Sequence, residues 1–222
     1  MISSTRTLPD GYIQTHEINL AKNKGLAVLL NIAGVFIFFF SFVLLGSFAN
    51  WVRPGLVSST FSFQLNLSTI VQLLALLALV ALITLVHELF HGFFFWVFTR
   101  SKPVYALHLT YAYAAAPDWF IPFRQYWIIG LAPLVIMDAI GLLLILLTPT
   151  SWILPVMLLV ALNTGGAVGD ILSIARLFRL SPVCLVKDRG DGVCFFEPDG
   201  SDVDWTDPGD AGGGGAAAFR TG

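Results

Sequence analysis

The chain has 222 residues, of which 56% are hydrophobic and 12% are charged, and its mean hydropathy is +0.80. Soluble domains usually contain about 25% charged residues, so this composition excludes an ordinary soluble enzyme. The net charge of −2 argues against a protein that binds nucleic acid. The two cysteines, Cys184 and Cys194, are too few for a disulfide framework and lack the spacing of a zinc-binding pair. Composition therefore predicts an integral membrane protein.

Charged residues are distributed unevenly along the chain. Residues 1–186 contain six acidic and nine basic side chains, whereas residues 187–222 contain eight acidic and three basic ones. The body of the chain is therefore apolar and mildly basic. Residues 198–222 consist largely of Asp, Gly and Ala, so we expect them to form a disordered acidic and Gly-rich tail.

Four apolar stretches have the length of membrane-spanning helices, because a helix rises about 1.5 Å per residue and the hydrocarbon layer is about 30 Å thick. The first stretch contains no charged residue, and the others contain only a few polar ones. They cover residues 26–48, 70–98, 126–147 and 152–178. We therefore predict an all-α membrane protein with four transmembrane helices.

Basic residues near the ends of the predicted helices indicate the orientation of the chain. With four crossings, one side of the membrane receives Lys22, Lys24, Arg100, Lys102, Arg124, Arg176 and Arg179. The loops of the opposite side contain only Arg53. Because cytoplasmic loops carry the excess of Lys and Arg, we predict a multi-pass protein of the cell membrane with both termini in the cytoplasm.

Two short segments outside the helices have the pattern of β-strands. Residues 104–113 alternate between two faces and are rich in aromatic and β-branched side chains, which predicts a short strand or hairpin after the second helix. Two apolar runs on either side of a polar turn predict a small cytosolic β-hairpin after the fourth helix. The predicted organisation is a cytosolic N-terminal segment, a membrane domain, this hairpin and the tail, at residues 1–25, 26–180, 181–197 and 198–222.

The second apolar stretch contains the sequence His87-Glu88-Leu89-Phe90-His91. Residues four apart lie on one face of a helix, so the two imidazoles can bind one Zn²⁺ at about 2.0–2.1 Å. The Glu between them is placed to act as general base on a zinc-bound water. Ionisable side chains inside a membrane helix are costly and usually functional, which favours a catalytic site. The alternative is a buried hydrogen-bonded cluster that holds helices together.

Depth in the membrane indicates the third metal ligand. His91 lies nine residues before Arg100, about 13 Å from the cytoplasmic helix end, and Asp170 lies six residues before Arg176, about 9 Å from the same side. We therefore predict Asp170 as the third ligand, near the level of the histidines. The neighbouring glycines at 165, 166 and 169 would let the backbone approach closely or unwind there.

Three other polar residues are weaker candidates. Asp138 lies about 21 Å from the cytoplasmic end of its helix, too deep to meet His91 unless the helix bends. It is expected to pair with a polar group in the bundle or to support a ligand. Asn163 could bind substrate or a ligand, or equally could form an interhelical hydrogen bond. His108 is expected to be an ordinary exposed residue on the polar face of its strand.

Three short motifs together carry a resemblance to known families. They are His-Glu-x-x-His-Gly at residues 87–92, Leu-Ala-Pro-Leu at residues 131–134 and Gly169-Asp170. The chain resembles a prokaryotic family of four-helix membrane proteins of the zincin metallopeptidase type over roughly residues 20–197. It is more distantly similar to the intramembrane zinc proteases of the site-2 type. This resemblance implies that His87, His91 and Asp170 bind zinc and that Glu88 is the general base.

The expected function is that of a membrane-embedded zinc metallopeptidase with one Zn²⁺. Its substrate would be a membrane or membrane-adjacent protein, cleaved by zinc-activated water with Glu88 as general base. An extended substrate could pair with the edge of the strand at residues 104–113. The alternatives are a metal or proton transporter and a non-peptidase zinc hydrolase that use the same His/Glu/Asp cluster. A transporter would more often have repeated halves, which this sequence lacks.

Overall fold

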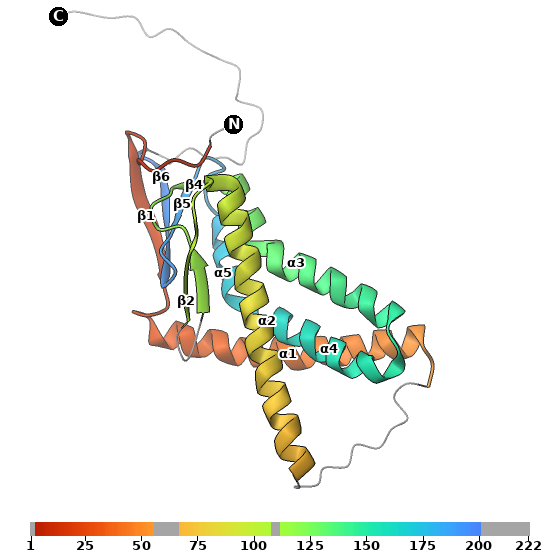
Figure 1. Ribbon diagram of the computed structural model, residues 1–222. Helices are drawn as coiled ribbons and strands as arrows, with labels where there is room; N and C mark the ends of the chain where they lie inside the picture. Colours follow the sequence, from red (N-terminus) through yellow and green to blue (C-terminus); the bar gives the residue numbers. More distant parts are fainter. Residues whose placement is uncertain (1–2, 56–66, 108–111, 201–222) are drawn as a thin grey trace, which may run out of the picture.

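The computed structural model describes residues 3–55, 67–107 and 112–200. Its helices are α1 (Lys24–Val52), α2 (Leu67–Thr99), α3 (Phe123–Leu147), α4 (Thr150–Gly166) and α5 (Val168–Leu177) (Figure 1). Its strands are β1 (Tyr12–Asn19), β2 (Val104–Leu107), β3 (Ala112–Ala115), β4 (Ile121–Pro122), β5 (Leu185–Asp188) and β6 (Gly192–Pro198).

The helices are compatible with a multi-pass membrane protein. Helices α1, α2 and α3 are each long and apolar enough to cross a membrane. Helices α4 and α5 are bent by 43° at Ala167 and together pass the same test, so the described residues contain three candidate spans, or four if the bent pair is one span. The fourth predicted helix is therefore divided. Glycines at 165, 166 and 169 surround the bend, where the absence of side chains lets the backbone change direction.

Two apolar clusters stabilise the helical body. One lies where α1, α3 and α4 meet and is formed by Leu45, Ala49, Ile145, Ile153, Val156, Met157, Val160 and Ala161. The other joins α2, α3 and α5 to the sheet through Phe95, Ile121, Tyr126, Ile129, Ile174, Leu177, Val186 and Phe195. Helix α3 contributes to both clusters and thus connects the two regions.

A four-stranded antiparallel sheet lies at one end of the helices, with the strand order β1-β6-β5-β4 (Figure 1). Strands β5 and β6 pair along Leu185↔Phe196 to Asp188↔Val193, in the segment that the sequence predicts as a hairpin. Strand β1 extends this hairpin on its other side, where Tyr12 pairs with Pro198 and Asn19 with Gly192. The N-terminal segment thus contains a strand, which sequence analysis did not predict.

Strands β2 and β3 form a second, two-stranded sheet after α2. They pair antiparallel from Val104↔Ala115 to Leu107↔Ala112, so the segment predicted as a short strand or hairpin after the second helix contains two paired strands. A period of two cannot distinguish one strand from two that pair with each other. Residues 108–111, including His108, lie outside the described residues, as do residues 201–222 of the predicted tail.

Candidate metal centre

The buried side of α2 contains both histidines. Ile83, His87, His91, Phe95 and Thr99 are all buried and follow one another at intervals of four residues, which places them on one face of the helix. The side chains of His87 and His91 are 11% and 9% exposed. Apolar side chains such as Leu85 and Leu89 point outward instead. This arrangement suits a helix in lipid, where the polar groups need partners inside the protein.

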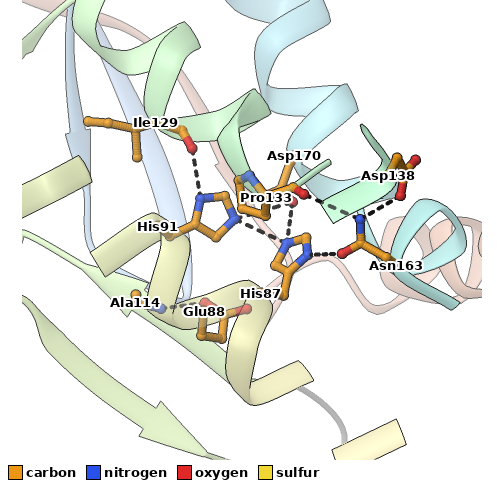
Figure 2. A network of polar contacts seen from close by, with 9 residues as sticks. All are labelled: His87, Glu88, His91, Ala114, Ile129, Pro133, Asp138, Asn163 and Asp170. Atoms are coloured by element: carbon orange, nitrogen blue, oxygen red, sulfur yellow. Dashed lines mark hydrogen bonds and ion pairs between the residues drawn. The ribbon is translucent and has the colours of Figure 1, made fainter. Parts of the chain in front are cut away.

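Asp170 reaches these histidines from the first turn of α5, directly after the bend. Its Oδ2 lies 3.0 Å from Nε2 of His87 and 3.4 Å from Nε2 of His91. The two Nε2 atoms are 3.2 Å apart (Figure 2). The structure therefore brings together the three side chains that the sequence predicts as metal ligands, and each offers one donor atom to a common centre.

The opposite ring nitrogens determine which atoms of the histidines carry protons. Nδ1 of His87 lies 2.9 Å from Oδ1 of Asn163, and Nδ1 of His91 lies 2.9 Å from the backbone oxygen of Ile129. Both oxygens can accept a hydrogen bond from an Nδ1–H group, and a neutral imidazole that donates in this way has its lone pair on Nε2. Two imidazole lone pairs and a carboxylate then face one another, an arrangement that a cation stabilises.

The spacing of these donor atoms fits zinc. Ligands at about 2.0–2.1 Å from a tetrahedral Zn²⁺ lie about 3.3–3.4 Å from each other. The observed separations of 3.0, 3.2 and 3.4 Å are close to this value. Catalytic zinc sites commonly use three protein ligands drawn from His and carboxylate side chains and leave one position open. His87, His91 and Asp170 provide this combination of two imidazoles and one carboxylate.

Glu88 follows His87 and therefore points about 100° away from it around the helix. Its Oε2 accepts a hydrogen bond of 2.7 Å from the backbone N–H of Ala114 in β3. Figure 2 shows this carboxylate between the histidine face of α2 and the strand. The contact orients the side chain of Glu88. It also shows that the free edge of β3, the edge not paired with β2, faces the site.

Asp138 and Asn163 lie next to the three donor atoms rather than among them. Asn163 is 1% exposed, and its Nδ2 donates a hydrogen bond of 2.9 Å to Oδ1 of Asp138. Oδ2 of Asp138 accepts a hydrogen bond of 2.8 Å from Thr164. Asp138 therefore contacts the site only through its neighbours, whereas Asn163 contacts His87 directly.

Two groups of this site could not be predicted from the sequence because both belong to the backbone. They are the carbonyl of Ile129, which faces His91, and the N–H of Ala114, which donates to Glu88. A polar contact between the helices and the sheet was also not predicted, in which the hydroxyl of Tyr126 donates a hydrogen bond of 2.9 Å to Asp188.

The comparisons with known proteins agree with this geometry. Residues 80–185 match the model of a family described as putative zincin peptidase, and this segment contains every side chain of the candidate metal centre. No curated protein and no solved structure matches the chain. The family predicted from the sequence motifs is thus the one whose model matches residues 80–185, the family of putative zincin peptidases.

Proposed function

We propose that the protein is a membrane-embedded zinc metallopeptidase that hydrolyses peptide bonds of a membrane or membrane-adjacent protein. The observation that carries the proposal is the convergence of three donor atoms at zinc-ligand spacing, with a carboxylate one residue away that is tied to the edge of a strand. The family match supports the peptidase class, and the long apolar helices support a position in the membrane.

His87, His91 and Asp170 would hold the metal. When bound, a zinc ion supplies a Lewis acid that polarises a carbonyl group and lowers the pKa of water to about 7. The Nδ1–H groups of both histidines donate to protein oxygens, which fixes the direction of the imidazole lone pairs before any metal arrives.

Glu88 would act as the general base. The N–H of Ala114 occupies Oε2 of its carboxylate and so fixes the side chain, which leaves Oε1 to accept a proton from water. The same carboxyl group would then deliver the proton to the nitrogen of the departing amine. A base of this kind contributes roughly 10²–10⁴-fold to the rate.

Strand β3 would bind the substrate in an extended conformation. Ala114 pairs with Tyr105 of β2, but its N–H is directed to Glu88. In a strand the N–H and C=O of one residue point to the same side, so the carbonyl of Ala114 also lies on the edge next to Glu88. A peptide that adds to this edge would bring its scissile bond beside the base. A helical membrane substrate would have to unwind first.

The test is the near-isosteric substitution Glu88→Gln. We expect cleavage of a library of fluorogenic single-span peptides in proteoliposomes to fall by about 10²–10⁴-fold, with the zinc content unchanged. The matched control is Glu17→Gln in β1, which removes a surface carboxylate that pairs with Lys22.

Cleavage by the Glu88→Gln protein at the wild-type rate would contradict the role of the base. Zinc flux into the proteoliposomes that is indifferent to this substitution would favour the transporter. Hydrolysis of lipid esters without peptide cleavage would favour a non-peptidase hydrolase.

A further inference from the structure

Helix α3 contributes no donor atom to the metal group found among the described residues, yet it contains two residues that are unfavourable in a membrane helix, Pro133 and Asp138. Figure 2 shows both residues in the polar network around the two histidines. We propose that α3 sets the orientation and tautomer of both imidazoles, with Pro133 acting on His91 and Asp138 acting on His87. This inference rests on the metal site of the proposed function and assigns positioning roles to two residues outside it.

Pro133 acts on His91 by freeing a backbone carbonyl. In an α-helix the N–H of residue 133 would donate to the carbonyl of Ile129, four residues earlier. Proline has no N–H, so this oxygen keeps its capacity to accept a hydrogen bond. Nδ1 of His91 lies 2.9 Å from the same oxygen. The proline thus creates the acceptor that holds the proton of His91 on Nδ1.

Asp138 acts on His87 through the amide of Asn163. The Nδ2 of this amide donates to Oδ1 of the Asp138 carboxylate at 2.9 Å and faces the backbone oxygen of Pro133 at 3.4 Å. The amide orientation is therefore determined, and its Oδ1 must point to His87. Because that oxygen can only accept, Nδ1 of His87 carries the proton.

A purely structural role for the two residues makes different predictions. If Pro133 only shaped α3, its replacement by alanine would restore a helix hydrogen bond and leave the metal site unchanged. If Asp138 only joined α3 to α4, its two hydrogen bonds, to Asn163 and Thr164, would matter equally. In the proposed arrangement only the bond to Asn163 reaches a ligand.

The first experiment compares Pro133→Ala with Pro155→Ala, a substitution of the proline inside α4. The carbonyl that Pro155 frees belongs to Ser151, at the opposite end of α4 from Asn163. We expect Pro133→Ala to weaken zinc binding about 10–100-fold in chelator competition, the usual effect of losing a partner of a ligating histidine. Its thermal stability should be equal or higher, because the helix regains a hydrogen bond. The Pro155→Ala protein should bind zinc like the wild type.

The second experiment compares three substitutions around the amide. Asp138→Leu removes the acceptor of Asn163 and should weaken zinc binding about tenfold or more. Asp138→Asn retains an acceptor oxygen and should restore most of the affinity. Thr164→Val removes the other hydrogen bond of Asp138, together with a contact to the carbonyl of Val160 within α4, and should have little effect on zinc binding.

Histidine tautomers provide a readout that does not depend on metal. We expect ¹⁵N NMR of the zinc-free wild type to show both imidazoles protonated on Nδ1, with His91 altered by Pro133→Ala and His87 by Asp138→Leu. Unchanged tautomers and unchanged zinc affinity in both variants would overturn the inference. A wild type that binds no zinc would overturn the proposed function instead, and the tautomers would still decide the roles of Pro133 and Asp138.

Discussion

Two interfaces within the helical body are held together in different ways. Where α1 meets α4, the contact is apolar and the backbones approach closely, so that a Cβ added at Gly34 would lie 2.7 Å from the carbonyl oxygen of Gly165. Where α2 meets α3, α4 and α5, polar groups form a continuous network from Asp138 through Asn163 and His87 to Asp170.

This difference indicates that the α1–α4 interface has a packing role and that the interface of α2 with α3, α4 and α5 has a functional one. Between helices in lipid the hydrophobic effect gives little net attraction, so close packing of small residues is a sufficient way to hold α1 on α4. A polar network in the same surroundings is costly unless its members are paired. Its presence at α2 therefore indicates a function, and the two interfaces should respond differently to substitution.

The largest effect on zinc binding is expected from removing donor atoms in the polar interface, the contact of α2 with α3, α4 and α5. His91→Ala and Asp170→Ala each remove a proposed ligand and should weaken zinc binding more than about 100-fold, beyond the range for partners of the ligands. Zinc content after dialysis against a chelator measures this effect. Leu45→Ala, in the apolar cluster of α1 and α4, is the control and should lower stability while zinc stays bound. Loss of zinc after His91→Ala but not after Asp170→Ala would remove the carboxylate from the site.

A smaller effect on stability alone is expected at the apolar interface. A Cβ at Gly165 would lie 2.8 Å from the backbone oxygen of Gly34, whereas a Cβ at Gly166 would meet nothing within 4 Å. We therefore expect Gly165→Ala to lower the free energy of unfolding by about 1–3 kcal/mol, as overpacking does. Gly166→Ala should be neutral or slightly stabilising. Denaturant titration in detergent measures both, and equal effects at the two positions would contradict a close approach of the backbones.

The sequence predicts the membrane helices and the donor set well because both depend on strong local signals. The long apolar helices α1, α2 and α3 are confirmed, since length and apolarity alone decide whether a helix can span a membrane. The approach of Asp170 to the histidines follows from counting residues back to the basic helix ends, because the second and fourth predicted spans both end at the cytoplasmic interface.

Features that depend on partners distant in the sequence were not predictable in the same way. Strand β1 is an edge strand with mixed polarity, and it is defined by its pairing with β6 at the other end of the chain. The acceptor for His91 is the carbonyl of Ile129, which every residue type possesses. The only local indication of this acceptor is Pro133, four residues later, which leaves the carbonyl of Ile129 without its helix partner. Whether that carbonyl meets a histidine depends on how α3 packs against α2.

The smallest effect concerns the contact between α3 and the sheet, where the buried Tyr126 donates a hydrogen bond to the half-buried Asp188. Burial raises the pKa of Asp188 to about 6, although hydrogen bonds from the N–H of Gly190 and the hydroxyl of Tyr126 favour its charged form. The folded protein therefore binds this proton more tightly than the unfolded chain, and the free energy of unfolding should fall as the pH rises from about 4 through 6.

The substitution Asp188→Asn tests whether this pair costs stability. An asparagine can still accept from Gly190 and donate to Tyr126, but it does not titrate. A shift from 3.8 to about 6 corresponds to at most about 3 kcal/mol, and partial exposure of the side chain reduces this value. We expect the variant to be the more stable protein at pH 7.5 and to lose this advantage below about pH 4. Thermal unfolding across this range measures the difference. If the difference in stability between the variant and the wild type does not change with pH, Asp188 does not titrate in this range. The contact of α3 with the sheet then carries no cost of buried charge, in contrast to the polar interface of α2.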